Sequence, residues 1–560
     1  MDFKEEIVKI LMAETKQSHE QIIQLLSVPP DSKLGDYAFP CFKLGGNPVE
    51  NAKKLQQKIK LPTFLSKIEV AGPYLNFFVN KSFLAQQTIT TILKQKGKYG
   101  ISLEGKGKTI VIDMSSPNIA KPFGIGHLRS TIIGNAIRNL MVFQGYKVIR
   151  INHLGDWGTQ FGKLIVAFKR WGNDKALDEN PIPYLLGLYV KFHEVAEQEK
   201  SIEDEARLWF KKLEDGDKEA LRLWKRFNTL SLKEFKKIYK ILGVEFEEYS
   251  GESFYNNKLD STIKLIQKRG ITEMSEGALI INLEDYGLPP VILRKSDGAT
   301  LYITRDIAAA LYRKKTYHFD KLLYEVGSEQ KSHFQQLFKV LELLGDSWYI
   351  NCVHVDHGLY LGKDGKKFST RKGKTVFMVD ILDETIALAR KIIEDKNPTL
   401  KHKDKVAQAI GVGAIIFGDL LNDRSKDMIF DLEKFTSFDG ETGPYLQYTH
   451  ARAGSILRKA GKINGKSDLT LLCLSQELAL ISLLSQFPDK ARESAHNYKP
   501  HVLCHYLIEL AQAFNEFYHA LVVISDDKEL MKARLALVTA AKQVLSNGLG
   551  ILGIVALEEM

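Results

Sequence analysis

The sequence has few cysteines for its length. Among 560 residues there are Cys41, Cys352, Cys473 and Cys504, which lie far apart and form no CxxC pair. This spacing excludes a zinc ribbon and a disulfide framework, and it is typical of a protein kept in a reducing cytosol. We therefore predict a cytoplasmic protein without structural zinc.

Long hydrophobic runs are also absent. No uninterrupted apolar segment approaches the length of a membrane span. The first residues, MDFKEEIVKILMAE, are acidic and amphipathic, whereas a secretory signal begins with a basic region followed by an apolar one. We expect no membrane partner.

Two common nucleotide-binding motifs are not found where a nucleotide site would need them. After Gly124 and Gly126 no third glycine comes at the spacing of the G-x-G-x-x-G dinucleotide-binding fingerprint, and the chain contains no G-x-x-x-x-G-K-[ST], which excludes a P-loop. We also find no internal repeat and no low-complexity tract.

What the sequence does have is an excess of positive charge. The formal net charge is +10, and the basic residues are spread through segments such as QQKIK, FKKIYK and GKKFSTRKGK. A dispersed cationic surface suits a large polyanion, although solvated lysine faces on helices explain part of the pattern. The apolar fraction of 44% and the charged fraction of 26% are typical of soluble globular proteins.

The length predicts several domains, because single cores rarely exceed about 250 to 300 residues. Residues 1–105 read as a small α+β unit, with a strand pair around the Gly-Pro turn of KIEVAGPYLNFFVN and a Lys- and Gly-rich linker over 94–108. Residues 106–404 form the next predicted domain, interrupted by a helical insertion at about 160–245. Almost every segment of 405–560 is helical, which predicts an all-α C-terminal domain.

The middle domain shows a strand–helix–strand pattern twice. TIVIDMS, a helix from Leu128 to Phe143 and KVIRINH form the first unit, and KLLYEV, a helix from Ser328 to Leu344 and YINCVHVDHG form the second. This pattern predicts an α/β fold with a Rossmann-like, doubly wound parallel sheet. In such sheets ligands bind at the carboxyl ends of the strands where the strand order reverses.

The turn after the first strand is a candidate phosphate site. In SSPNIAKPFGIGHLRST, Gly124 and Gly126 permit close backbone approach, and the start of a helix favours anions. His127 follows directly and Lys121 stands just ahead. Alone, His127 reads more often as a polar helix-start residue without a ligand. However, His127 lies in a strand–turn–helix unit, which favours a ligand. A basic loop, LGKDGKKFSTRKGKTV, follows the second unit, and together the two elements favour a shared nucleotide site.

At these residues the chain resembles the class I aminoacyl-tRNA synthetases, and among them the arginyl-tRNA synthetases. SSPNIAKPFGIGHLRST is similar to that family's HIGH segment, and NHLGDWGTQFGKL, LYITRDIAAA, KKFSTRKG and GPYLQYTHAR follow in the family's order. The resemblance runs along essentially the whole chain. It implies an ATP-dependent ligase that forms arginyl-adenylate and then transfers arginine to the 2′-hydroxyl at the 3′ end of tRNA(Arg).

The resemblance also implies the substrates and the assembly. L-Arginine, ATP and tRNA(Arg) are the expected partners of a monomer. Mg²⁺ is expected to ride on the ATP phosphates with mostly water ligands, so that no dedicated metal site is needed.

Family roles carry over to the nucleotide-binding residues. Lys121, His127 and Lys367 are implied as catalytic residues, and Gly124, Gly126, His127, Lys367 and Ser369 as the ATP-binding set. Two positions depart from the general class pattern, because Gly124 replaces the first histidine of HIGH and Thr370 replaces the second lysine of the KMSKS loop. In the family, a lysine at the position of Lys121 takes over that charge.

A guanidinium calls for carboxylate partners, since its planar fork of donors pairs bidentately with them. Asp306 lies four residues after Tyr302, so one turn of helix presents both. The resemblance implies that these two residues bind arginine together with Gln330, that Asn118 holds its α-amino and carboxylate end, and that Asp113 contributes where relatives often have glutamate.

For tRNA, the family places the anticodon on the C-terminal helices. The resemblance implies that the binding residues there are Tyr445, Tyr448, Arg452, Tyr518 and Met560. Aromatic rings on a basic helix suit unpaired bases, although core packing is an equal explanation for Tyr445 and Tyr448. In the N-terminal domain, Asn76 and Phe78 are expected to meet the tRNA elbow.

Two other functions remain open at this point. A tRNA-binding paralogue with impaired catalysis is suggested by Gly124, although Lys121, His127 and Lys367 speak against it. Another class I synthetase, such as the cysteinyl enzyme, is disfavoured by Asp306 and by the missing cysteine and histidine zinc ligands. His153 either touches the adenylate or packs at the end of its strand.

Overall fold

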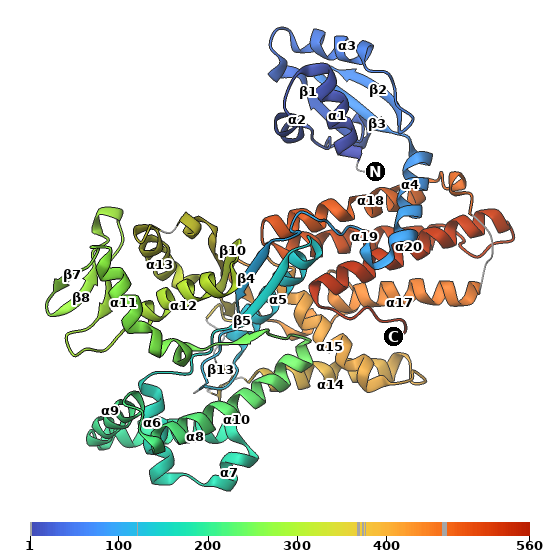
Figure 1. The fold of residues 1–560 in the computed structure, drawn as a ribbon. Helices are drawn as coiled ribbons and strands as arrows, with labels where there is room; N and C mark the ends of the chain where they lie inside the picture. The colour runs from blue at the N-terminus through green and yellow to red at the C-terminus, as the bar shows by residue number, and fades with distance from the viewer. Residues whose placement is uncertain are drawn as a thin grey trace.

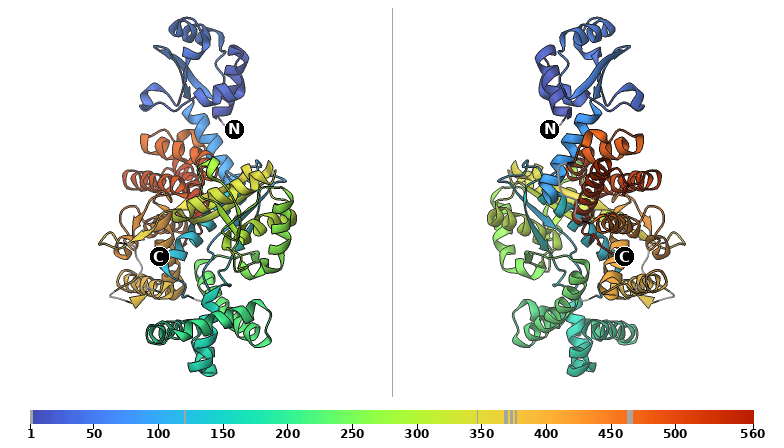
Figure 2. Two further views of the ribbon diagram at one scale, coloured as in Figure 1. Left: turned by 90° about the vertical axis from the view of Figure 1, so that its left-hand side faces the viewer. Right: turned by 90° about the vertical axis from the view of Figure 1, so that its right-hand side faces the viewer.

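The computed structural model describes residues 3–119, 121–345, 347–366, 370–371, 374–375, 377–461 and 467–560. Lys367 and Ser369, two of the predicted ATP-binding residues, lie outside these ranges. The molecule is elongated, with the N-terminal domain at one end, the helical insertion at the other, and the parallel sheet beside the C-terminal helices between them (Figures 1 and 2).

The N-terminal domain is an antiparallel sheet with helices, in the strand order β1-β3-β2. Its elements are α1 (Phe3–Thr15), α2 (His19–Leu25), β1 (Tyr37–Pro40), α3 (Pro48–Lys58), β2 (Leu65–Ala71) and β3 (Tyr74–Val79). The predicted strand pair around the Gly-Pro turn is confirmed as β2 and β3, which pair from Ala71 and Tyr74 outward.

The predicted linker over 94–108 is packed instead of free. Helix α4 (Lys81–Gln95) contacts α18 (Ser475–His496) and α20 (Lys528–Leu552) of the C-terminal domain. Beyond it, Tyr99 is buried, stacks on Phe487 with ring centroids 6.0 Å apart, and donates its hydroxyl to the carbonyl oxygen of Leu484 at 3.0 Å. One buried aromatic ring thus anchors a segment whose lysines and glycines are typical of a linker.

The central domain contains the predicted parallel sheet, in the order β11-β10-β4-β5-β6. Its strands are β4 (Thr109–Asp113), β5 (Lys147–Asn152), β6 (Glu248–Tyr249), β10 (Lys321–Gly327) and β11 (Cys352–His357). The chain runs from β4 to β5 and β6 on one side and then returns to β10 on the other. The strand order therefore reverses between β4 and β10, where a ligand is expected.

Both faces of this sheet are covered, as a parallel sheet requires. Because side chains alternate along a strand, Leu323 and Val355 pack in the large core that includes α5 (Ile125–Phe143), whereas Leu322 and Tyr324 pack in the core with α12 (Tyr302–Tyr317) and α13 (Lys331–Leu343). The helices predicted from Leu128 to Phe143 and from Ser328 to Leu344 are observed as α5 and α13.

Helices fill the insertion between β5 and β6. They are α6 (Thr159–Trp171), α7 (Asp174–Glu179), α8 (Pro181–Gln198), α9 (Ser201–Glu214) and α10 (Lys218–Leu242). After β6 come α11 (Leu259–Lys268) and a small antiparallel sheet that the sequence did not predict, β7 (Glu273–Ser275), β8 (Ala278–Ile281) and β9 (Val291–Arg294).

The C-terminal domain is helical, as predicted, with one short exception. Helix α14 (Met378–Lys396) precedes it, and its own helices are α15 (Lys403–Leu420), α16 (Leu432–Phe435), α17 (Gly443–Ala460), α18, α19 (Pro500–Ala520) and α20. Strand β15 (Met428–Ile429) pairs with β12 (Tyr360–Leu361), which directly follows the last strand of the parallel sheet. This pairing ties the two domains together.

Short elements complete the described chain. They are the hairpin strands β13 (Thr370–Arg371) and β14 (Lys374–Thr375), and the 3₁₀ turns Ser32–Leu34, Cys41–Leu44, Lys96–Lys98, Glu252–Lys258, Glu284–Tyr286, Ser328–Gln330, Ser347–Asn351 and Leu469–Leu471.

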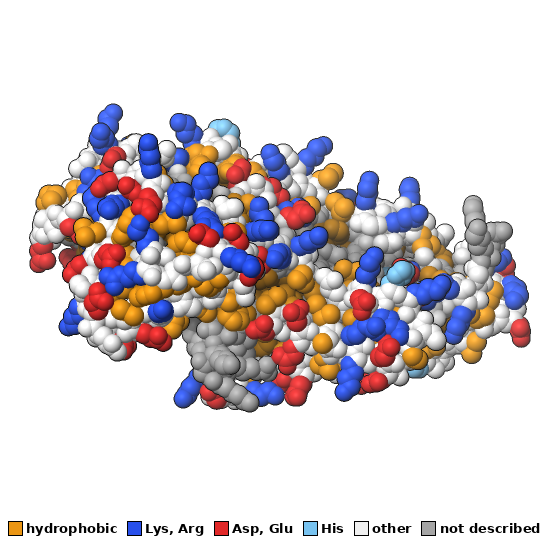
Figure 3. Space-filling model, turned by 90° about the horizontal axis from the view of Figure 1, so that it is seen from below, with side chains coloured by type: hydrophobic (Ala, Val, Ile, Leu, Met, Phe, Trp, Pro, Cys, Tyr) orange, Lys and Arg blue, Asp and Glu red, His pale blue; other side chains and the backbone are white. Residues whose placement is uncertain are grey.

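Within the described part of the chain, α20 alone is long and apolar enough to cross a membrane, but 61% of its most apolar window is buried inside the protein. It is a core helix of the C-terminal domain. On the face seen from below, lysine and arginine side chains are scattered and interleaved with acidic ones, in agreement with the dispersed charge of the sequence (Figure 3).

Candidate functional site

A cleft of about 250 Å³ lies at the point where the strand order reverses. Its walls come from the loop after β4, the start of α5, the end of β10 and the segment after β11. Ser116, Gly126, His127, Gly327 and Tyr360 are among the residues that line it. Two of the predicted ATP-binding residues therefore face the predicted place in the sheet.

The glycines of this turn leave space for a ligand. A Cβ atom at Gly126 would meet nothing within 4 Å, so the backbone there borders open space in the cleft. Gly124 is the N-cap of α5 and has no side chain to cap it. The first amide groups of the helix are consequently available to an anion.

His127 is neutral in this setting. Burial, together with the positive charge of Lys121, lowers the pKa of its imidazole to about 4. The ring packs on Phe123 at 5.5 Å between centroids, and Nδ1 is buried without a hydrogen-bond partner. His127 can therefore offer a hydrogen bond to a phosphate oxygen, while the positive charge comes from the exposed Lys121.

A second group of side chains surrounds Asp306 near the start of α12. His333 donates from Nε2 to Asp306 Oδ2 at 2.7 Å, and Nε2 of His153 lies 3.7 Å from Asp306 Oδ1. The ring of Tyr302 lies over His333 with centroids 4.9 Å apart, and Tyr302 is 58% exposed. Gln330 precedes α13 and is also exposed. The predicted residues Tyr302 and Asp306 thus share one helix end, as their spacing predicted.

The turn that carries His127 and the group of side chains around Asp306 lie at neighbouring strand ends. Asn118 forms a parallel bridge with Gly155, and Ile119 donates its amide to Gly155 O at 3.1 Å. A Cβ at Gly155 would lie 3.3 Å from Asn118 Cα, so a side chain there would press on this backbone. This bridge brings the loop that leads to His127 beside the loop that carries His153.

Asp113 has a different role from the predicted one. It is buried, its Oδ2 lies 2.8 Å from Nη1 of the buried Arg313 on α12, and its Oδ1 accepts from Ser116 Oγ at 3.0 Å. Its carboxylate already holds a guanidinium of this chain, so it is not open to a free arginine. The sequence could not show this, because the two partners lie far apart in the chain.

Two acidic residues near Asp306, Glu252 and Asp156, were not identified from the sequence. Burial raises the pKa of Glu252 to about 7, against the opposite effect of Arg305. Burial also raises the pKa of Asp156, which accepts hydrogen bonds from Ser253. The signal available was their position, since Asp156 lies in LGDWG directly after β5 and Glu252 lies directly after β6.

The predicted C-terminal residues meet at one surface. Tyr448, Arg452 and Met560 line a cavity of about 620 Å³. The guanidinium of Arg452 lies over the ring of Tyr448 at 4.9 Å and over that of Tyr518 at 5.3 Å. Tyr445 joins them through Asn515, whose Nδ2 donates to the Tyr445 hydroxyl at 2.9 Å and whose Oδ1 accepts from Arg452. Tyr448 and Tyr518 are 42% and 38% exposed, which leaves ring faces open for stacking.

The N-terminal residues differ from each other. Asn76 is only 4% exposed, so its side chain offers almost no surface to a partner. Phe78, two residues along β3, is half-buried, and Lys67 lies over its ring at 4.0 Å. Phe78 and Lys67 together present an aromatic and basic surface.

Comparison with known proteins agrees with this architecture. The family model for "tRNA synthetases class I (R), catalytic domain" matches residues 88–432, "Arginyl tRNA synthetase N terminal domain" matches residues 2–79, and "DALR anticodon binding domain" matches residues 446–560. The chain belongs to the arginyl-tRNA synthetases. Its fold, with a parallel-sheet catalytic domain between an N-terminal domain and a helical anticodon-binding domain, is the one predicted.

Relatives match over their full length. The arginine–tRNA ligase of Halothermothrix orenii is 47% identical and that of Clostridioides difficile is 48% identical, each with 100% of both chains covered. The structure of the Thermus thermophilus arginyl-tRNA synthetase superposes with a TM-score of 0.85 at 25% identity, with 100% of both chains covered. Another class I synthetase is thereby excluded as the identity of this chain.

Within the described ranges, no group of three or more histidine, cysteine, aspartate or glutamate side chains is arranged to hold a metal ion. The expectation of Mg²⁺ on the ATP phosphates, and of no structural zinc, stays a prediction.

Proposed function

We propose that this arginyl-tRNA synthetase activates arginine with ATP in the cleft between β4 and β10 and then transfers it to the 3′ end of tRNA(Arg). The observation that carries this proposal is the bridge between Asn118 and Gly155, which brings the loop before α5 beside the loop of His153, whose Nε2 lies 3.7 Å from Asp306 Oδ1. Adenylate formation needs these two features next to each other, because the carboxylate of arginine must attack the α-phosphate.

Arginine recognition rests on Asp306. Its side chain is 23% exposed, and its oxygens keep free lone pairs beside the hydrogen bond from His333, so it can accept the guanidinium fork bidentately. Tyr302 and Gln330 are proposed to contact the same substrate. Lysine and ornithine cannot fill both acceptor positions, so they leave an acceptor unpaired. Asn118 is proposed to hold the α-amino and carboxylate end. Asp113 is not part of this set, since Arg313 occupies it.

ATP recognition rests on the start of α5. We assign the close backbone approach to Gly126, the role of a neutral hydrogen-bond donor to His127 and the role of an exposed positive charge to Lys121. Gly124 leaves the helix amides uncovered. Lys367 is proposed to contact the β- and γ-phosphates, and Ser369 to belong to the ATP-binding set, as the family implies. Such groups accelerate phosphoryl transfer by positioning and by neutralising charge. Magnesium is proposed to enter with ATP, held by its phosphates and water.

tRNA binding is proposed for two surfaces. On the C-terminal domain, Tyr448 and Tyr518 stack on anticodon bases, with Arg452 between them as the shared cation. Tyr445 and Met560 support this surface from its rim. On the N-terminal domain, Phe78 is proposed to meet the elbow, and Asn76 supports the strand from its buried position.

The remaining assignments follow from the family. We propose a monomer that acts in the cytoplasm, with domains at 1–105, 106–404 and 405–560 and the helical insertion at about 160–245. The packing of α4 and Tyr99 on the C-terminal helices makes residues 81–105 the physical joint between the first and third of these domains.

Charging of tRNA with each amino acid tests the proposal directly. Selective arginylation is expected, and pyrophosphate exchange without tRNA should be near background, as is typical of the family. The variant K367A should lose charging rate while tRNA affinity changes little. Absence of arginylation by the unsubstituted protein with its cognate tRNA would support the catalytically impaired paralogue instead.

A further inference from the structure

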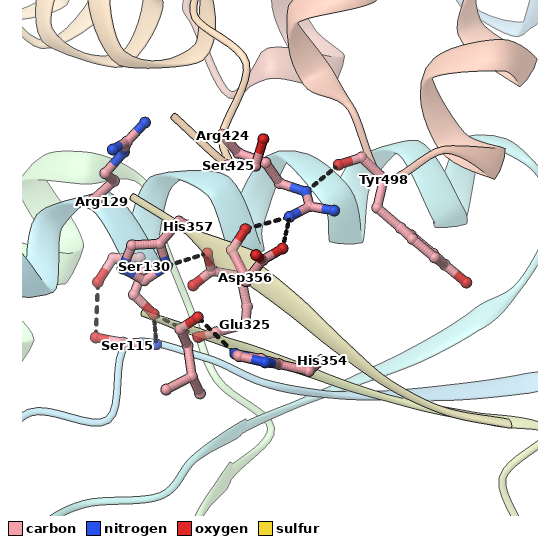
Figure 4. Close-up of polar contacts among 12 residues, drawn as sticks. Ser115, Arg129, Ser130, Glu325, His354, Asp356, His357, Arg424, Ser425 and Tyr498 are labelled. Atoms are coloured by element: carbon pink, nitrogen blue, oxygen red, sulfur yellow. Dashed lines mark hydrogen bonds and ion pairs between the residues drawn. The ribbon is translucent and has the colours of Figure 1, made fainter. Parts of the chain in front are cut away.

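Two residues that line the cleft have chemistry that the proposed function does not use. Glu325 lies on β10 and His357 ends β11, and both face the side of the sheet covered by α5. His357 donates from Nδ1 to Glu325 Oε1 at 2.8 Å (Figure 4). The two side chains are 1% and 7% exposed, so this is a buried acid–imidazole pair at the floor of a cleft.

This pair is incompletely satisfied. Glu325 Oε2 is buried and has no hydrogen-bond partner. Nδ1 of His357 is engaged by Glu325, which leaves Nε2 as the ring nitrogen that a molecule in the cleft can reach. Buried polar groups are nearly always satisfied in proteins, and an exception that lines a cleft indicates a ligand.

The surrounding charges determine what Nε2 offers. Arg129 on α5 contacts Asp419 on α15, with Nε 3.4 Å from Oδ1, and Asp419 also accepts from the Tyr360 hydroxyl. Around His357, the carboxylates of Glu325 and Asp419 carry two negative charges and the guanidinium of Arg129 carries one positive charge. Burial and the charge of Arg129 lower the pKa of His357, but Glu325 and Asp419 raise it by more. The pKa of His357 is therefore raised overall. A proton on His357 balances the group, so Nε2 is a donor.

The two ends of the cleft suit different parts of ATP. The start of α5, with His127, is the end that favours phosphate. Glu325 and His357 line the cleft from β10 and β11, whereas the turn that leads to the start of α5 follows β4, on the other side of the point where the strand order reverses. A planar base fits there, because its ring nitrogens are uncharged acceptors and its amino group is a donor. We propose that His357, held by Glu325, donates a hydrogen bond from Nε2 to a ring nitrogen of the adenine base of ATP.

This inference rests on the proposed function, which sets the phosphates at the helix start. It assigns His357 as a base-binding residue and Glu325 as a positioning residue that acts through it. Neither role involves a change of covalent bonds.

A cycle of protein and ligand changes tests the contact. We would measure the KM for ATP and for 1-deaza-, 3-deaza- and 7-deaza-ATP in tRNA-dependent pyrophosphate exchange, with the unsubstituted protein and with H357F. For the unsubstituted protein, the KM for the analogue that lacks the contacted nitrogen should be about 10- to 100-fold higher than the KM for ATP, as expected for a lost charged hydrogen bond. With H357F, ATP itself should show that rise, and the same analogue should add less than about twofold.

Additive effects of H357F with all three analogues would overturn the proposal. A second variant, H357N, keeps the cycle interpretable if the phenylalanine is not tolerated in the fold. The unsubstituted protein must charge tRNA with arginine in the same experiment. Failure there contradicts the proposed function, whereas normal charging with additive effects contradicts only this inference.

His354 provides a matched control on the same strand. It faces the other side of the sheet, where its Nε2 donates to Val326 O at 3.0 Å and its ring packs on Phe334 at 4.4 Å. The variant H354F should therefore leave the KM for ATP within about twofold of the unsubstituted protein. An equal rise of KM in H354F and H357F would show that the loss of any histidine from β11 has this effect, and would overturn the proposal.

The role of Glu325 has its own readout. As pH rises through the pKa of His357, the donor is lost and the KM for ATP should increase. E325Q keeps an acceptor oxygen but removes the charge that raises this pKa, so the increase should begin at a lower pH. Identical pH profiles for E325Q and the unsubstituted protein would overturn the positioning role.

Discussion

The cleft in the parallel sheet and the surface around Arg452 both lie where the sequence predicted binding, but they are built differently. The cleft depends on buried groups, such as His127, whose pKa burial lowers to about 4, and the Glu325–His357 pair. The Arg452 surface depends on exposed rings held by a cation, with Tyr448 and Tyr518 more than one-third exposed.

This difference has an energetic consequence. A buried charge or polar group that loses its partner pays the full cost of desolvation, whereas an exposed stack loses only its own contribution. Substitutions in the cleft should therefore have large effects on chemistry, and substitutions at the Arg452 surface should have smaller effects confined to tRNA binding.

The largest effect is expected at Asp306. D306A should lower kcat/KM for arginine at least about 100-fold, because it removes the proposed bidentate charged contact. D306N, which keeps the shape but not the charge, should lower it nearly as much. The measurement is arginylation at varied arginine concentration. If D306A reduced kcat/KM by less than about threefold, arginine would have to bind elsewhere.

His127 should follow. H127A should reduce the rate of adenylate formation by about 30- to 100-fold while the KM for arginine changes little, since a preorganised donor to phosphate is lost. Because the pKa of His127 is about 4, this residue should cause no change in rate between pH 6 and 8. The imidazole of His127 becomes charged only at acidic pH, near its pKa of about 4. An inflection near pH 6.5 that disappears in H127A would contradict the neutral assignment.

The Arg452 surface should respond more weakly. Y448A should raise the KM for tRNA by about tenfold, since one base stack is worth about 1 to 3 kcal/mol, and the KM for ATP and arginine should stay unchanged. Y448F keeps the ring face and is the matched control. Equal effects on ATP and on tRNA would remove the distinction between the two regions.

The smallest effect concerns Glu252 and stability. Its pKa rises from 4.5 in the unfolded chain to about 7 in the folded protein. Between these values the folded state binds more protons, so its contribution to stability falls as pH rises from 4.5 to 7. E252Q stays neutral and should flatten this decline, with a gain of about 1 to 2 kcal/mol at pH 8. Thermal unfolding of both proteins at pH 5.5 and pH 8 measures this gain. If E252Q changed stability by the same amount at both pH values, the raised pKa of Glu252 would be contradicted.

Local patterns were sufficient for much of the fold. Four of the five strands of the parallel sheet, the helix α5 and the helical insertion follow from periodicity and from glycine at a turn, which are properties of neighbouring residues, whereas the two-residue strand β6 was not predicted. The spacing of Tyr302 and Asp306 likewise placed both on one helix end. The resemblance to the synthetase family supplied the roles of these residues, which spacing alone does not.

What the sequence could not show were contacts between distant segments. Asp113 pairs with Arg313, and Tyr99 is buried against Phe487, because folding brings together residues hundreds of positions apart. The burial of Asn76 depends likewise on the sheet that surrounds it. Glu325 did leave a signal, since a single carboxylate inside the apolar strand KLLYEV is costly unless it has a partner or a function.

The position of bound arginine relative to the helix start of α5 tests the account most directly. A structure with arginine and a non-hydrolysable ATP analogue should show the guanidinium on Asp306, between Tyr302 and Gln330, and the α-phosphate beside Gly126 and His127. A guanidinium that lies away from Asp306, or a nucleotide outside the cleft between β4 and β10, would contradict it.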